Sequence, residues 1–165
     1  MKEENKVLLI SKYELDCKPY NEEKEDVTWE TSTLRTWLNN AFINNAFSQS
    51  EQALIATTTV SADENLEYST KPGNATQDKV FLLSIKEVNT YFPSNEARMC
   101  TPTNYTIEQG IFIDSGRTSC DWWVRSPGAY QSNAACVLPD GESHENGLNV
   151  ESDDCGVRPA LWINL

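Results

Sequence analysis

Apolar residues recur at helical spacing in one stretch of the first half of the chain. The spacing is i, i+3, i+4, i+7 and i+8, and the residues are Leu34, Trp37, Leu38, Ala41 and Phe42. This spacing places all of them on one face of a helix. Thr31 or Ser32 is available as the N-cap. The pattern therefore predicts a helix over 32–44 whose apolar face packs in the core.

Shorter helices are predicted from signals at their ends. The motif Ser-x-x-Glu occurs at 48–51 and at 84–87. In a capping box the serine and the glutamate satisfy backbone N–H groups of the first turn, so a helix should begin at each motif. A further helical turn is predicted over 102–109, with Thr101 as its N-cap and Gly110 at its end.

β-branched and apolar runs predict the strands. They are 7–10, 56–62, 79–84, 121–126, 134–138 and 157–163. Turn-forming residues separate the last three, which indicates an antiparallel meander in the second half of the chain. The segments 14–30 and 62–78 lack clean periodicity and are predicted as surface loops. Together these elements predict a single α+β domain over residues 1–165.

Charge narrows the range of partners. The chain has 13 Lys+Arg against 25 Asp+Glu, which gives a formal net charge of -12. Such a charge repels nucleic acid and anionic lipid, so neither is expected as a partner. No apolar run approaches the roughly 20 residues of a membrane helix, so no membrane insertion is expected. The opening residues are too short and too acidic for a signal peptide.

The cysteines do not form a metal-binding pattern. They are Cys17, Cys100, Cys120, Cys136 and Cys155, an odd number with no CxxC spacing. They can form two disulfides with one thiol left over, or stay reduced as small apolar side chains, and the reduced state is favoured. We expect no zinc, no other metal and no cofactor.

Seven segments, in their order along the chain, resemble a bacterial domain family of unknown function that is common in surface proteins of gut Firmicutes. They are "LLISKYELDCKPYN", "VTWETSTLRTWLNNAF", "AFSQSEQALIATTTV", "DKVFLLSIKEV", "YFPSNEARMCTPTNY", "WWVRSPG" and "GVRPALWINL". The resemblance implies a C-type-lectin-like fold, with an antiparallel sheet and two to four short helices packed on it. This fold is related to the Fibrobacter major paralogous domains and, more distantly, to the formylglycine-generating enzymes. The resemblance implies a cell-surface or extracellular location and no known activity.

The start of the chain departs from the family pattern. The family has a Gly-aromatic strand and a Trp-containing strand ahead of the segment "VLLISKY", whereas here the chain begins. The sequence is then either a fragment of a longer surface protein or a short form that lacks these strands. In both cases the strand at 7–10 is expected to be an exposed edge that the charged segment "KEENK" protects.

The two frame segments, 122–128 and 156–165, enclose an insert of different character over 129–155. The insert is polar, acidic and rich in turn residues, which is typical of a recognition surface on a rigid scaffold. It resembles the variable segment that diversity-generating retroelements produce in some lectin-like domains. The predicted function is a non-enzymatic ligand-binding or adhesion domain for a protein or a glycan. The candidate contacts are Tyr130, Gln131, Asn133, His144, Asn146 and Asn149.

Two other classes of function stay open. One is an enzyme, or a degenerate enzyme, of the formylglycine-generating-enzyme-like branch, and the other is a structural module of a larger surface protein. No catalytic residue is assigned, because neither the cysteines nor His144, expected in an exposed loop, lies in a recognisable catalytic motif. The carboxylates of the insert form either a solvated acidic rim or a calcium site, and the rim is favoured. They are Asp140, Glu142, Glu145, Glu151, Asp153 and Asp154.

The tryptophans and arginines of the frame also admit more than one role. Trp122 and Trp123 are adjacent, so their side chains should point to opposite sides of a strand. Either both are buried, or one lines a ligand groove. Arg125 and Arg158 are expected to be structural, because a buried guanidinium needs partners for its donors and can tie the two frame strands together.

Overall fold

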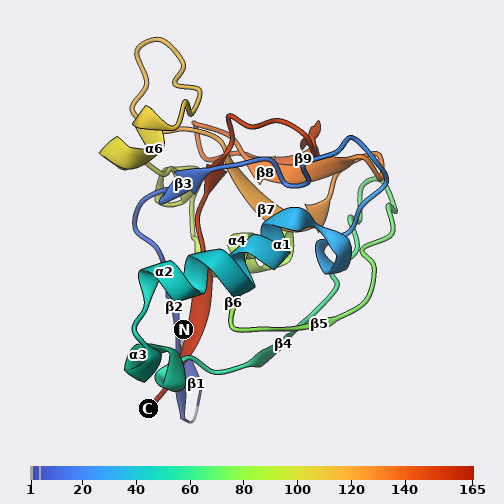
Figure 1. Ribbon diagram of the computed structural model, residues 1–165. Helices are drawn as coiled ribbons and strands as arrows, with labels where there is room; N and C mark the ends of the chain where they lie inside the picture. Colours follow the sequence, from blue (N-terminus) through green and yellow to red (C-terminus); the bar gives the residue numbers. More distant parts are fainter. Residues whose placement is uncertain (1, 4) are drawn as a thin grey trace.

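The C-terminal half of the chain forms most of a five-stranded sheet in the computed structural model, which describes residues 2–3 and 5–165 (Figure 1). Its strands, in spatial order, are β3 (Asp16–Cys17), β10 (Gly156–Val157), β7 (Trp122–Pro127), β8 (Asn133–Val137) and β9 (Ser143–Asn149). Strands β7, β8 and β9 form an antiparallel meander, as predicted. Strand β10 pairs antiparallel with β3 but parallel with β7.

A second sheet joins the two ends of the chain. In spatial order it contains β1 (Lys2–Glu3), β2 (Lys6–Ile10), β11 (Ala160–Asn164) and β6 (Val80–Phe81), and all neighbours are antiparallel. In the described part of the chain, strand β1, from the charged segment at the chain start, pairs with β2 only at Lys6 and Val7. The strand predicted at 7–10 is therefore covered on this side at its first residue only, and Leu9 is 48% exposed. A small antiparallel pair, β4 (Thr58–Val60) and β5 (Thr76–Asp78), completes the strands described.

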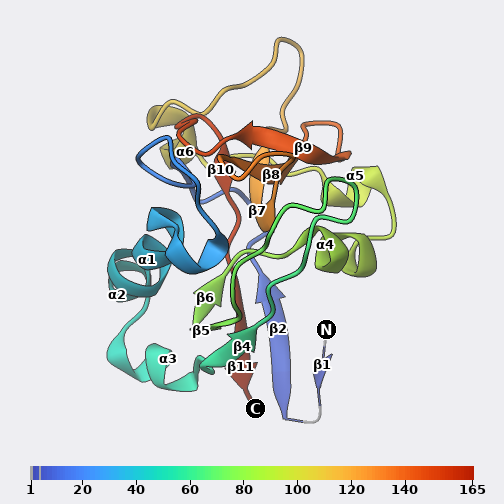
Figure 2. The same ribbon diagram turned by 90° about the vertical axis from the view of Figure 1, so that its right-hand side faces the viewer.

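Short helices flank these sheets. They are α1 (Thr33–Trp37), α2 (Ile43–Ala46), α3 (Gln49–Leu54), α4 (Ile85–Tyr91), α5 (Asn95–Arg98) and α6 (Asn104–Glu108), with a 3-10 turn η1 (Trp29–Thr31) ahead of α1. Figure 2 shows α1, α2 and α3 on one side of the strands and α4 and α5 on the other. The architecture is α+β with antiparallel sheets. None of the helices described is long and apolar enough to cross a membrane.

The capping signals confirm most of the predicted helix starts. Ser32, Ser48 and Ser84 are N-caps, and the last two form the predicted capping boxes. Helix α6 is capped by Thr103 and not by Thr101. The reason is long-range, because Glu14 forms a parallel bridge with Pro102: its N–H donates to the carbonyl oxygen of Thr101 at 3.2 Å, and its carbonyl oxygen accepts from the N–H of Thr103 at 3.1 Å.

The predicted helix over 32–44 is present, but a π-helical turn interrupts it. The turn η2 spans Leu38–Phe42 and joins α1 to α2. It inserts one residue into the helical register, so the buried face continues at Ile43, which is 4% exposed. Phe42 and Trp37 are only partly buried at the margin of the core. The regular 3.6-residue period could not show this shift.

Replacing Trp37 with alanine is expected to lower the free energy of unfolding by only about 1–2 kcal/mol, less than the ~3–5 kcal/mol typical of a core tryptophan. Its ring packs on Phe42 at 5.2 Å between centroids and lies under the Lys18 ammonium at 5.0 Å, both at the surface. Leu38→Ala, at a fully buried position of the same helix, should cost ~2–5 kcal/mol. Urea denaturation of both variants checks the order, and a larger loss for Trp37→Ala would contradict it.

The tryptophans of the frame are buried, which excludes the alternative that Trp122 or Trp123 lines a groove. Both are 0% exposed. The indole N–H of Trp122 donates to the carbonyl oxygen of Arg98 at 3.1 Å, and that of Trp123 donates to the carbonyl oxygen of Lys18 at 2.9 Å. These bonds satisfy the polar atoms that burial would otherwise leave unpaired.

Arg158 is buried and structural, as predicted, but it ties the frame to the chain start and to α5. Its Nε donates to the carbonyl oxygen of Ser11 at 3.0 Å and its Nη1 to that of Arg98 at 3.2 Å. The guanidinium lies 4.9 Å from the ring centroid of Trp122 and 5.0 Å from that of Phe92. These contacts explain why the frame needs an arginine here and not a lysine.

Next to Arg158, the side chain of Glu14 is 0% exposed, and neither carboxylate oxygen has a hydrogen-bond partner among the residues described. Burial raises the pKa of Glu14 to about 8, although the charge of Arg158 opposes the shift. Gly156 makes room for this side chain, because a Cβ at that position would lie 2.7 Å from Glu14 Cγ. The carboxyl group is therefore held neutral inside the fold at pH values where a free glutamate is ionised.

The second frame segment is not one strand. The structure splits the predicted strand 157–163 into β10 and β11, which belong to different sheets. Arg158 and Pro159 lie at the break, and Pro159 has no N–H to continue a ladder. Only β10 is a neighbour of the first frame strand, with Gly156 opposite Trp122.

Candidate functional site

Two bulges on either side of β8 shape the region around the insert. Between the pairs Trp123–Cys136 and Pro127–Ala134, β8 contributes one residue and β7 contributes three. Strand β9 likewise contributes three residues opposite Ala135. Bulges bend a strand and re-aim its side chains. Both bulges lie opposite Ala135 of β8, so β7 and β9 depart from regular pairing with β8 at the same position along that strand.

Gly147 permits the bulge in β9. Its φ is 76°, a left-handed conformation that side chains other than glycine rarely adopt. A Cβ there would also collide with the backbone of Ala134 on β8. The glycine thus lets β9 approach β8 closely, while the carbonyl oxygens of Glu145 and Asn146 accept hydrogen bonds from Asn65 and Ala129, outside the β8 ladder. This strand lies in the insert that sequence analysis predicted as mostly loop.

One asparagine binds the loop at 61–70 to both bulged strands. Asn65 is 1% exposed, and its Nδ2 donates to the carbonyl oxygen of Pro127 at 2.9 Å and to that of Glu145 at 2.8 Å. Its Oδ1 accepts from the backbone N–H groups of Glu67 at 3.1 Å and of Tyr68 at 3.2 Å. All four hydrogen-bonding positions of the amide are used. The loop is therefore a fixed wall beside the sheet.

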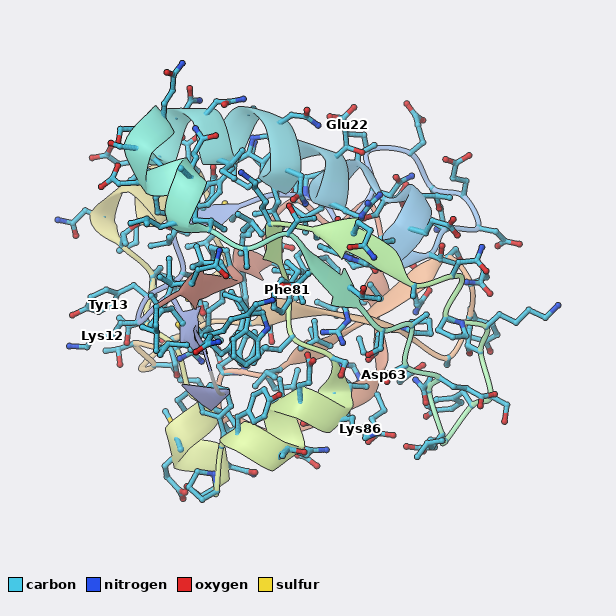
Figure 3. All side chains as sticks on the ribbon, turned by 90° about the horizontal axis from the view of Figure 1, so that it is seen from below. Lys12, Tyr13, Glu22, Asp63, Phe81 and Lys86 are labelled. Carbon is cyan, nitrogen blue, oxygen red and sulfur yellow. The ribbon has the colours of Figure 1, made fainter. Side chains whose placement is uncertain are left out.

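A pocket of about 320 Å³ opens between this loop, α4 and the bulged strands. Its lining includes Asp63, Asn65, Lys86, Asn89, Ser126 and Glu145. Figure 3 shows Asp63 and Lys86 on neighbouring segments, the loop and helix α4. The Ser126 hydroxyl oxygen accepts from the backbone N–H of Ile85 at 3.1 Å, which holds the start of α4 against the bulge of β7. The lining thus comes from four segments that are far apart in the sequence: the loop, α4, β7 and β9.

Arg125 lies at the base of this region, where it is 3% exposed. Its guanidinium forms ion pairs with Glu87 of α4 and with Asp63 of the loop, the latter at 3.2 Å. Its Nη1 also donates to the carbonyl oxygen of Leu82 at 2.8 Å. The predicted structural role is confirmed, but the partners differ, because the side chain ties β7 to α4 and the loop and not to the second frame segment.

Glu145, which lines the pocket, lies close to Glu67 and Tyr68 of the loop. Burial, then the neighbouring Glu67 carboxylate, raises the pKa of Glu145. The pKa of Tyr68 is also raised, by burial and then by Glu67, with smaller effects from Glu145 and Tyr130. Tyr68 is 41% and Tyr130 70% exposed. The loop and the insert thus present two aromatic rings next to two like-charged carboxylates.

The predicted contact residues of the insert differ in how exposed they are. Tyr130, Asn146 and Asn149 are exposed, and Asn149 is opposite the half-buried Asn133 in the register of β8 and β9. Gln131 is turned inward, because its Nε2 donates to the carbonyl oxygens of Val27 at 2.9 Å and of Lys71 at 3.0 Å. Gln131 therefore joins the insert to the backbone at Val27 and Lys71, and its side-chain N–H groups are already used within the fold.

His144 is half-buried on β9 and not in an exposed loop as expected. Its Nδ1 lies 3.9 Å from the Sγ of Cys136. Burial raises the pKa of the Cys136 thiol far above its usual range, and the charge of Asp121 adds to the shift. A nucleophilic cysteine needs a lowered pKa, so this pair is not arranged for thiolate chemistry.

The five cysteines are all free and buried, in agreement with the predicted reduced state. In the part of the chain that the structure describes, no three His, Cys, Asp or Glu side chains are grouped so that they could hold a metal ion. Of the carboxylates of the insert, Glu151 pairs with Lys24 at 3.6 Å and Glu145 lines the pocket. The solvated acidic rim stays a prediction.

Comparison with protein families gives a match over nearly the whole chain. Residues 4–165 fit the sequence profile of the family described as "Domain of unknown function (DUF6273)". The chain belongs to this family. No curated protein and no solved structure matches it. The resemblance to a family of unknown function is thus supported, and the DUF6273 assignment itself names no ligand or reaction.

Sequence reasoning missed the residues that the 61–70 loop and α4 bring to the candidate site. Asp63, Asn65, Glu67 and Tyr68 lie in a segment predicted only as a surface loop. One signal was available, since loops of more than about 12–15 residues without regular structure are often functional. The contact of this loop with β9 could not be seen, because Asn65 and Glu145 are 80 positions apart.

Proposed function

We propose that this DUF6273 domain is a non-enzymatic ligand-binding or adhesion domain, and that it binds through the pocket and the exposed part of the insert beside it. The observation that carries the proposal is the pocket of about 320 Å³, because its walls are fixed by Asn65 and Arg125 and its rim carries exposed side chains. Preformed concave sites with a few fixed polar groups are typical of ligand binding. A protein or a glycan partner is proposed.

A C-type-lectin-like fold, a place in a surface protein and a diversified insert are part of the same proposal. Antiparallel sheets with short helices support the fold assignment. The alternation of exposed and buried residues in 129–155 supports the diversified insert, with Tyr130, Asn146 and Asn149 as the positions free to vary. Gln131 and Gly147 should not vary, because one binds two carbonyl oxygens and the other has a φ of 76°. The raised pKa of the Cys136 thiol supports the non-enzymatic proposal over the enzyme alternative.

The triple variant Tyr130→Ala, Asn146→Ala, Asn149→Ala is expected to lose partner binding while its stability stays near that of the parent. Surface substitutions usually change the free energy of unfolding by at most ~0.5 kcal/mol each. A partner would first be sought with a glycan array and with purified surface proteins, and its affinity then measured by calorimetry. Denaturation of the same samples reports the stability.

The matched control is Tyr105→Ala, Asn45→Ala, Asn104→Ala, which removes the same side-chain types from exposed positions on α2 and α6. It should bind like the parent. If the control loses binding and the insert variant keeps it, the proposed surface is the wrong one. Equal loss in both variants without a loss of stability would also contradict the proposal.

A further inference from the structure

We propose that the pocket between the 61–70 loop, α4 and β9 binds an alkylammonium group, supplied by a lysine side chain of a partner protein or by a free diamine. This inference rests on the proposed function and specifies the chemistry of its ligand. The charges around the pocket, a nearby tyrosine and the size of the pocket each bear on the choice.

The charges around the pocket favour a cation. Asp63 already pairs with Arg125, at 3.2 Å. Glu64 and Glu145 line the pocket with a single lysine, Lys86, and Glu67 is hydrogen-bonded to Glu145. Within the described part of the chain none of these three glutamates has a salt-bridge partner. No lysine or arginine occurs in the sequence between Arg125 and Arg158. An anionic ligand would be repelled, and a cation would relieve the repulsion between the carboxylates.

A tyrosine near the pocket favours an organic cation over a metal ion. Tyr68 is an exposed ring close to Glu67 and to Glu145 of the pocket lining, and Tyr130 is close to Tyr68. The face of an aromatic ring attracts an ammonium or guanidinium group by roughly 0.5–1 kcal/mol at exposed sites. The described residues contain no grouping of three metal-ligating side chains. An ammonium ion, in contrast, needs only a few acceptors for its three donors.

The lining fits the rest of such a ligand. Ile85 and Leu66 provide apolar surface on two sides of the pocket, which suits the methylene chain of a lysine or a diamine. Asn89, Thr90 and Ser126 provide amide and hydroxyl oxygens. A volume of about 320 Å³ is at the lower end of the range for small-molecule sites, so it suits one extended side chain better than a branched oligosaccharide.

Lys86 gives the proposal a distinctive test. It lines the pocket from α4 and is the only cation of the lining. Replacing it with glutamine removes a like charge, so it should tighten alkylammonium binding about 2- to 5-fold. Glu145→Gln should weaken binding about 5- to 10-fold by the same reasoning. A neutral sugar would not respond with opposite signs to these two changes.

The experiment is an NMR titration of the ¹⁵N-labelled domain at neutral pH and low salt. The probes are cadaverine, N-acetyl-lysine methylamide, its Nε-acetylated form and 1,5-pentanediol. The two charged probes should shift the amide resonances of the pocket, the neutral ones should not, and added salt should weaken binding. A response to cadaverine alone indicates a free diamine, and a response to the lysine compound indicates a protein partner.

The control variant is Glu142→Gln, an exposed carboxylate near the start of β9 that does not line the pocket. It should bind the charged probes like the parent. Equal shifts with 1,5-pentanediol, no shifts with either charged probe, or no effect of Glu145→Gln would each overturn the inference. If the charged probes fail while the triple variant of the insert still loses its partner, the ligand class is wrong and the proposed function stands. If they bind while that variant keeps its partner, the proposed surface is wrong instead.

Discussion

Replacing Arg125 with methionine is expected to lower the free energy of unfolding by ~3–5 kcal/mol, because it leaves buried polar groups without their partner. The guanidinium is 3% exposed and pairs with Glu87 and Asp63. It also donates to the carbonyl oxygens of Leu82, at 2.8 Å, and Ser61, at 3.1 Å. Methionine supplies a similar apolar stem but no donor, so two carboxylates and two carbonyl oxygens lose a hydrogen-bond donor together.

Urea denaturation at neutral pH measures this loss. The matched control is Arg117→Met, since Arg117 forms an exposed pair with Asp114 at 3.4 Å and its removal should change stability by less than ~1 kcal/mol. The double variant Arg125→Met, Glu87→Gln should recover part of the loss, because it removes one of the carboxylates that are left unpaired. A loss below ~1 kcal/mol for Arg125→Met would show that the guanidinium is not a structural tie.

The second large effect is a dependence of stability on pH that originates at Glu14. Its pKa is raised from 4.5 to about 8 in the folded protein, so the folded state keeps a proton that the unfolded chain releases. The stability that this proton contributes is therefore lost as pH rises from about 4.5 to about 8. Between pH 6 and pH 8 the expected loss is roughly 2–3 kcal/mol, at 1.36 kcal/mol for each pH unit.

The range above pH 6 isolates Glu14, because Asp121, whose pKa burial raises to about 6, contributes with the same sign mainly at lower pH. In Glu14→Gln the side chain is neutral at every pH, so the slope between pH 6 and pH 8 should largely disappear. The exposed Glu22→Gln is the control and should keep the slope of the parent. Denaturation midpoints across this range measure the effect. A parent protein with no slope would contradict the assignment.

The helices that depend on short-range sequence signals were predicted correctly. The capping boxes at Ser48 and Ser84 depend on residues three positions apart, and both helices begin as expected. Strand β9 was missed because its half-exposed residues are polar and because Gly147 interrupts the two-residue period at the bulge. The helical face shifted from Phe42 to Ile43 for a similar reason, since a π-helical turn changes the period within the helix.

The candidate site was predictable only in part. Tyr130, Asn146 and Asn149 are exposed polar or aromatic residues of the insert, and the structure keeps them accessible. The pocket depends instead on contacts between segments that lie far apart, such as Asn65 with Pro127, which are 62 positions apart. A single sequence carries no signal for such a pairing, because an asparagine in a polar loop is ordinary in composition.

Asn65 also determines whether the pocket keeps a wall at all. Its amide donates to two carbonyl oxygens through its nitrogen and accepts from two backbone N–H groups through its oxygen. Conversion of that amide to a carboxylate would keep the two accepted bonds within the loop but set acceptor against acceptor at Pro127 and Glu145. Exchange of one nitrogen for one oxygen would thus remove both of the bonds by which this residue joins the loop to the sheet.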